Sequence, residues 1–174
     1  PGWLYSVKMG GTTIWELWDS MKPDRTIPDT GMNSFNHYSK GAVGDWLYRE
    51  AVGLKETSAG YKTFMVRPNP GGGFKYMGAD KVTPYGRAAA KWYDEPGKFT
   101  LEVEVPASSN SYILKASIPA NTTAEIYVPS PSVDAVTVDG VAVASVADVK
   151  VIGKDGPYAK FVVGSGKYKF VANR

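Results

Sequence analysis

The spacing of hydrophobic and polar residues changes near residue 60. Residues 1–57 hold four of the five Trp, the only His and one segment with helical periodicity, whereas residues 61–174 contain short alternating runs rich in Val, Thr, Gly and Pro. A period of 3.6 residues is typical of an amphipathic helix, and a period of two is typical of a half-buried strand. The pattern therefore predicts a helical part at 1–57 and a β-rich domain at 58–174.

The clearest alternation lies at residues 98–105. Phe99, Leu101, Val103 and Val105 are predicted to point inward, and Thr100, Glu102 and Glu104 outward. Similar runs occur at 61–66, 87–93, 111–118, 124–128, 133–138, 158–163 and 167–171, with Gly, Pro, Asn or Asp clusters between most of them. Many short strands with turn signals at this spacing predict an antiparallel, jelly-roll-like β-sandwich with hardly any helix.

Residues 33–52 are predicted to form a helix. Asn33 or Ser34 is suited to cap its start and Gly53 to end it. One face would carry Phe35, Tyr38, Ala42, Val43 and Trp46, and the opposite face His37, Gly41, Gly44 and Tyr48. Each internal glycine destabilises a helix by about 1 kcal/mol relative to Ala. Two explanations stay open: close packing against another helix, or room beside His37 for a ligand.

Composition narrows the classes of function. The chain has 174 residues, 43% of them hydrophobic, which indicates a globular protein. The net charge of +3 comes from scattered Lys and Arg, and nucleic-acid binding needs clustered positive charge. There is no Cys, no apolar run long enough to span a membrane, and no zinc, calcium or phosphate-binding motif. We therefore expect no cofactor, metal, nucleic acid or membrane span.

Residues 10–19, GGTTIWELWD, hold the candidate chemistry. Glu16 lies between Trp15 and Trp18, with Asp19 close by. Indole rings stack on the C–H faces of sugars, while a carboxylate activates water or binds a hydroxyl group. The alternative is that Glu16 is a solvated surface residue and that Trp15 and Trp18 belong to the hydrophobic core. His37 is either structural or a ligand to substrate.

The runs GGTTIWELWDS and MNSFNHYSKGAVGDWLYREAVGL resemble the α-L-rhamnosidase family of glycoside hydrolases, and GYKTFMVRPNPGGGF and TPYGRAAAKW match the family's C-terminal region. The resemblance covers about residues 1–128. It implies an inverting hydrolase with an (α/α)₆ catalytic barrel followed by a C-terminal β-sandwich. The helical segment at 1–57 would then be the end of the barrel. Gly11 stands where the family usually has Ala, and Leu17 where it commonly has Arg.

The resemblance also implies roles for individual residues. Glu16 matches the family's general base, His37 matches a His that contacts rhamnose, and Trp15 and Trp18 would help to wall the site. The general acid lies far upstream in the family, outside this sequence. The start PGWLYSVKMGG, without Met, suggests a fragment. Because the general acid is absent, we expect this chain to be inactive alone.

The expected partners are a rhamnose-containing glycoside or polysaccharide and the remainder of the parent chain. The alternative function is a non-catalytic β-sandwich module for glycan binding or domain packing. The parent sequence upstream of Pro1 would separate the two, because only the enzyme needs an acidic motif in it.

Overall fold

The computed structural model describes residues 2–105 and 122–173, which fall into two compact units. The first runs to Trp46 and the second starts at Leu47. The predicted domain boundary at 57/58 stays a proposal. None of the helices in the described part of the chain is long and apolar enough to cross a membrane.

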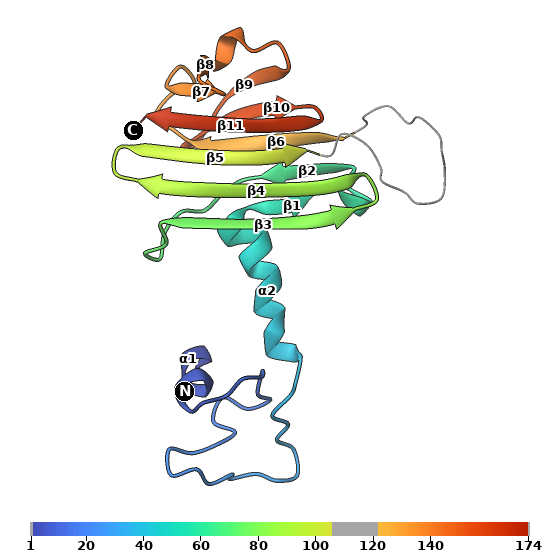
Figure 1. The fold of residues 1–174 in the computed structure, drawn as a ribbon, viewed down its shortest axis with the longest axis vertical. Helices are drawn as coiled ribbons and strands as arrows, with labels where there is room; N and C mark the ends of the chain where they lie inside the picture. The colour runs from blue at the N-terminus through green and yellow to red at the C-terminus, as the bar shows by residue number, and fades with distance from the viewer. Residues whose placement is uncertain (1, 106–121, 174) are drawn as a thin grey trace. The chain divides into compact units, whose positions relative to one another are not determined.

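The second unit contains two sheets packed face to face (Figure 1). One sheet has the order β1-β2-β6-β10-β9 and the other the order β3-β4-β5-β11-β7-β8. The strands of the first sheet are β1 (Leu54–Glu56), β2 (Thr63–Val66), β6 (Thr123–Pro129), β9 (Val149–Asp155) and β10 (Tyr158–Val163). Those of the second are β3 (Tyr76–Thr83), β4 (Gly86–Glu95), β5 (Lys98–Val105), β7 (Val136–Val138), β8 (Val141–Ala142) and β11 (Gly166–Asn173).

The core lies between the sheets and follows the period-two pattern. Phe99, Leu101 and Val103 of β5 are buried as predicted. Their neighbours include Trp92, whose indole N–H donates a hydrogen bond of 3.1 Å to the Ala51 carbonyl. This bond holds the end of the helical segment at residues 47–52 against β4. The predicted two-sheet sandwich is confirmed.

Three details differ from the prediction, and a fourth part of it is not tested. Thr100 is buried, although it lies on the face opposite Phe99 and Leu101. Strands β2 and β6 pair in parallel, although their neighbours pair antiparallel. Strands β1, β3, β8 and β9 were not predicted, because they are short or lie largely exposed at sheet edges. The predicted strand at 111–118 lies outside the described residues.

The predicted helix at 33–52 is too long at its start. Helical structure begins with the 3₁₀ turn η1 (Ser39–Ala42), continues as α2 (Val43–Trp46) and ends in the π-helical turn η2 (Leu47–Val52). Asn33 and Ser34 are therefore not its caps. Gly53 follows the last turn with φ of +87°, as a glycine stop requires. The first unit also contains α1 (Trp3–Lys8). The remaining 3₁₀ turns, η3 (Ala59–Tyr61) and η4 (Val143–Ser145), connect strands of the second unit.

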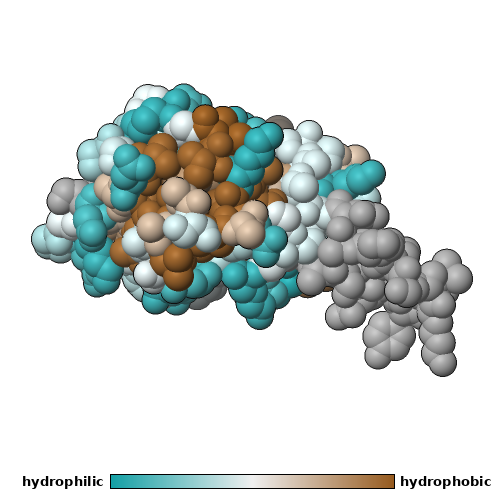
Figure 2. Space-filling model, turned by 90° about the horizontal axis from the view of Figure 1, so that it is seen from above, coloured by the Kyte–Doolittle hydropathy of each residue, from teal (hydrophilic) through white to brown (hydrophobic). Residues whose placement is uncertain are grey.

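One end of the sandwich carries exposed apolar side chains (Figure 2). It is the end formed by β8, η4 and β9, where both sheets reach an edge. Val141, Val151 and Ile152 are 39–49% exposed there, and Ala142 and Ala144 are exposed beside them. Ile152 is the extra residue of a β-bulge opposite Lys160 and Phe161. A bulge at an edge disturbs the ladder and discourages pairing with another strand.

Candidate functional site

The candidate site residues lie in the first unit, on two segments joined by backbone hydrogen bonds. The Glu16 amide donates to the Ser34 carbonyl at 2.8 Å, and the His37 amide donates to the Ile14 carbonyl at 2.7 Å. The Thr13 hydroxyl also donates to the Phe35 carbonyl. This pairing brings the backbones of Glu16 and His37 close together. It also explains why residues 33–38 are not helical, because their backbone groups bond to residues 13–16.

The Glu16 carboxylate accepts one hydrogen bond, of 2.7 Å, from the Ser34 amide to Oε2. Its side chain is partly buried. No hydrogen bond joins Glu16 to His37 among the residues that the structure describes. A carboxylate has about four acceptor positions. The Ser34 amide therefore orients Glu16 while leaving acceptor positions for a water molecule.

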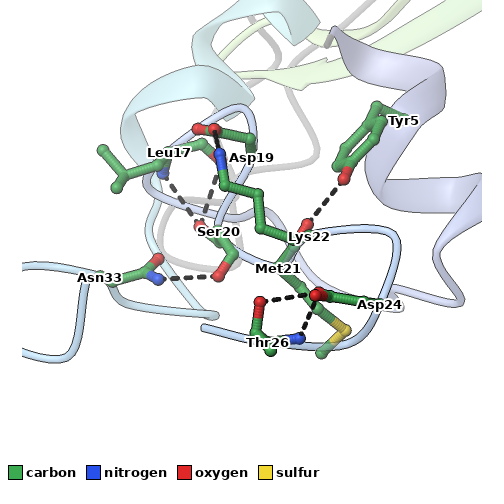
Figure 3. A network of polar contacts seen from close by, with 9 residues as sticks. All are labelled: Tyr5, Leu17, Asp19, Ser20, Met21, Lys22, Asp24, Thr26 and Asn33. Carbon is green, nitrogen blue, oxygen red and sulfur yellow. Dashed lines mark hydrogen bonds and ion pairs between the residues drawn. The ribbon is translucent and has the colours of Figure 1, made fainter. Parts of the chain in front are cut away.

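Asp19, the other carboxylate of the motif, is engaged by a cation. Its Oδ2 forms an ion pair with Lys22, and this contact lowers the pKa of Asp19 (Figure 3). A carboxylate that is held by an ammonium group is a weaker proton acceptor than a free one. The local contacts thus favour Glu16 over Asp19 as a base.

The loop after Trp18 is closed by a polar network that Figure 3 shows. Buried Ser20 accepts a hydrogen bond from the Leu17 amide at 3.2 Å and donates one to the Leu17 carbonyl at 3.1 Å. Its own carbonyl accepts from Asn33 Nδ2 at 2.9 Å. The Tyr5 hydroxyl donates to the Met21 carbonyl at 2.7 Å. The loop is therefore supported from both sides, although Leu17 replaces the family's common Arg.

The His37 ring contacts Ser39, the first residue of the 3₁₀ turn η1. The Ser39 amide donates to His37 Nδ1 at 3.3 Å, and the Ser39 hydroxyl lies 3.0 Å from the same atom. A nitrogen that accepts an amide hydrogen bond carries no proton, so the neutral ring has its proton on Nε2. Nε2 is then the donor that the ring offers outward. The ring stacks on Tyr38, which is 87% exposed.

Trp15 lies in the interior of this unit. It is 5% exposed, and its ring meets Phe35 edge-on with a centroid distance of 5.1 Å. A Cβ added at Gly11 would lie 2.8 Å from Trp15 Cζ2 and 2.9 Å from the Ser6 carbonyl oxygen. Because Gly11 has no Cβ, the Trp15 ring has room to lie against it. Within this chain Trp15 supports the loop from behind.

Trp18 is open to solvent over 41% of its surface. Its ring meets Trp3 edge-on at 5.1 Å, and Lys40 Nζ lies 4.0 Å from the ring centroid. Lys40 Nζ is buried without a hydrogen-bond partner among the described residues. Burial lowers the pKa of Lys40, and the charges of Asp19 and Glu16 oppose that shift. Sequence reasoning missed Lys40, because a single Lys after a turn gives no signal of a cation–π contact.

In the described part of the chain, no three His, Asp or Glu side chains gather to hold a metal ion.

Two family models match the sequence. Residues 1–51 match the bacterial α-L-rhamnosidase 6-hairpin glycosidase domain, and residues 53–114 match the bacterial α-L-rhamnosidase C-terminal domain. An α-L-rhamnosidase of Streptomyces avermitilis is 36% identical over 98% of this chain, and one of Formosa agariphila is 34% identical over 99%. The chain belongs to the α-L-rhamnosidase family.

Solved structures of α-L-rhamnosidases share the fold. The Streptomyces avermitilis enzyme, crystallised with L-rhamnose, covers 99% of this chain with a TM-score of 0.82 and 33% identity. The Aspergillus terreus enzyme covers 99% with a TM-score of 0.70 and 33% identity. This chain spans only 14% and 17% of the length of the two curated relatives named above, and 15% and 16% of those two solved chains. It matches the C-terminal part of these α-L-rhamnosidases.

Proposed function

We propose that this chain supplies the general base of an α-L-rhamnosidase that removes terminal α-L-rhamnose with inversion. Glu16 is the base, His37 is a ligand to the sugar, and Trp18 walls the site with Trp15 behind it. The remainder of the parent chain supplies the general acid and the other helices of the barrel. The substrate is a rhamnose-containing glycoside or polysaccharide.

The observation that carries this proposal is the backbone pairing of residues 14–16 with residues 34–37. It brings the backbones of Glu16 and His37 close together, while Ser34 orients the Glu16 carboxylate and Ser39 donates to His37 Nδ1. A base in an inverting enzyme takes a proton from water on the face of the sugar opposite the leaving group. The Ser34 amide orients the Glu16 carboxylate for this task through its hydrogen bond to Oε2.

The helical segment exposes apolar side chains, which supports the proposal that a further part of the parent chain packs against it. Val43, Trp46 and Leu47 are 38–51% exposed, although the pattern places the first two on the apolar face. An amphipathic helix buries that face against another element. In the proposal, the remainder of the parent chain covers it.

Glu16→Gln in the full-length protein tests the base. The substitution keeps the shape but removes the proton acceptor, so kcat on an aryl α-L-rhamnoside should fall by about 10²–10⁴-fold with little change in KM. Asp19→Asn is the matched control, since Asp19 lies in the same loop and is ion-paired with Lys22. It should keep most of the wild-type kcat. A near-normal kcat in Glu16→Gln together with a collapse in Asp19→Asn would transfer the role to Asp19.

The stereochemical outcome is a separate test. Proton NMR of a fresh reaction should show the β-anomer of rhamnose first, because water attacks from the face opposite the leaving group. First appearance of the α-anomer would contradict inversion.

A further inference from the structure

The outer face of the six-stranded sheet is hollowed. The hollow lies over β3, β4, β5 and β11, which run side by side in Figure 1. Its volume is about 530 Å³. Pockets for small molecules typically measure about 300–1,000 Å³. All residues that line the hollow belong to the second unit, and neither Glu16 nor His37 is among them.

The strand register explains why the face is hollow. Side chains on one face of a sheet alternate along each strand and line up across strands. One row across the four strands is Asp80, Ala89, Glu104 and Lys167, and the next is Gly78, Lys91, Glu102 and Lys169. Ala89 and Gly78 are the small members of the two rows. They form the floor, and the longer side chains around them form the walls.

The charges around the hollow balance one another. Its lining includes four basic and four acidic side chains. Arg87 bridges Asp80 at 3.2 Å and Glu104 at 2.8 Å. Lys169 lies 3.7 Å from Glu102, and Lys167 lies 3.7 Å from Glu104. The hollow therefore offers many hydrogen-bond donors and acceptors with no net charge, which suits a neutral polar ligand.

Tyr76 lines one side of the hollow, and Tyr93 lies next to Tyr76 on the neighbouring strand. Tyr76 and Tyr93 are cross-strand partners whose rings lie 6.1 Å apart with an angle of 25°. Tyr76 is 61% exposed. Lys91 Nζ lies 5.9 Å and 5.1 Å from the two ring centroids. Exposed aromatic faces next to paired polar groups match a sugar, which has C–H faces and hydroxyl edges.

A protein partner fits this face less well. The centre of a protein interface is depleted of charged residues and rich in apolar ones. Here eight charged side chains surround a floor of glycine and alanine. We propose that this hollow binds a neutral oligosaccharide segment, at a site separate from the proposed catalytic residues.

The test uses the full-length protein and a soluble rhamnan, with dextran as the unrelated polymer. Affinity electrophoresis measures the dissociation constant for the rhamnan, and an aryl α-L-rhamnoside reports activity. Tyr76→Ala/Tyr93→Ala removes the aromatic surface, and Ala89→Leu fills the floor while keeping both tyrosines. Each should raise the rhamnan dissociation constant about tenfold or more, without changing activity on the aryl rhamnoside.

Val82→Ala is the matched control. Val82 is 84% exposed on the same strand as Tyr76 but does not line the hollow. It should bind the rhamnan as the wild type does. Unchanged rhamnan binding in both hollow variants, or no rhamnan binding by the wild type, would overturn the proposal. A fall in melting temperature or aryl-rhamnosidase activity in Ala89→Leu would also overturn it, because it would show that protein covers the face. None of these readouts depends on Glu16 being the base.

Discussion

The tautomer of His37 has a kinetic consequence at the scale of one residue. Because the Ser39 amide occupies Nδ1, the neutral ring would offer Nε2–H to a sugar hydroxyl in the proposed site. Removing a ligand hydrogen bond weakens binding by about 0.5–1.5 kcal/mol, and by more if the sugar hydroxyl is left buried without a partner. We expect His37→Ala in the full-length protein to raise KM by about threefold to tenfold or more, with a smaller effect on kcat. Steady-state kinetics on an aryl rhamnoside measures both. Tyr38→Ala serves as the control, since its ring is exposed, and an unchanged KM in His37→Ala would remove His37 from the substrate contacts.

The end of the helical segment is the most constrained element. Gly53 has φ of +87°, and a Cβ there would lie 2.1 Å from the Arg67 carbonyl oxygen. Gly53→Ala should therefore destabilise the second unit by about 2–5 kcal/mol, through left-handed strain and a backbone clash. Gly140→Ala is the matched control, because Gly140 has φ of +84° with nothing within 4 Å of an added Cβ among the described residues. It should lose only about 1–2 kcal/mol. Equal melting temperatures for the two variants would show that the contact with Arg67 is unimportant.

The glycines inside the same helical segment behave differently. Added Cβ atoms at Gly41 and Gly44 meet no described atom within 4 Å. The described residues of this chain therefore do not pack closely against these glycines, and the neighbour expected from the sequence would belong to the remainder of the parent. In the full-length protein, Gly44→Leu should lower melting temperature and activity, because bulk would strike that neighbour. Glu50→Leu, at an exposed position of the same segment, should have little effect. Lost activity with an unchanged melting temperature would favour the ligand-space explanation, and wild-type behaviour of Gly44→Leu would contradict both explanations.

At the scale of the whole molecule, activity should require the parent chain. An inverting site needs two carboxyl groups about 6.5–9.5 Å apart, and this chain spans only 14–17% of its two curated relatives. We expect the purified 174-residue chain to release no p-nitrophenol from the α-L-rhamnoside, while the full-length protein does. Robust release by the short chain, free of host enzymes, would contradict this.

Sequence patterns predicted what depends on local alternation. The two-residue period at 98–105 gave the inward side chains of β5, and Gly53 gave the helix end. The true start of the helix could not be predicted, since it depends on hydrogen bonds from residues 33–38 to a distant segment. The pairing of residues 14–16 with 34–37 and the Lys40–Trp18 contact were missed for the same reason.

The parallel pairing of β2 with β6 sets the order in which the sandwich forms. Strands β3, β4 and β5 pair with their neighbours in sequence, so this meander is complete as soon as Val105 has been synthesised. Strand β2 ends at Val66, and it stays unpaired on this side until its partner β6, which starts at Thr123, has been synthesised. At about 5–20 residues per second, that interval of 57 positions lasts roughly 3–11 s on the ribosome. During that time the edge of β2 that later pairs with β6 is unprotected, and a chain truncated before Thr123 would keep it so. Nascent chains should therefore aggregate most readily in this window, and slower translation across it would lengthen the exposure.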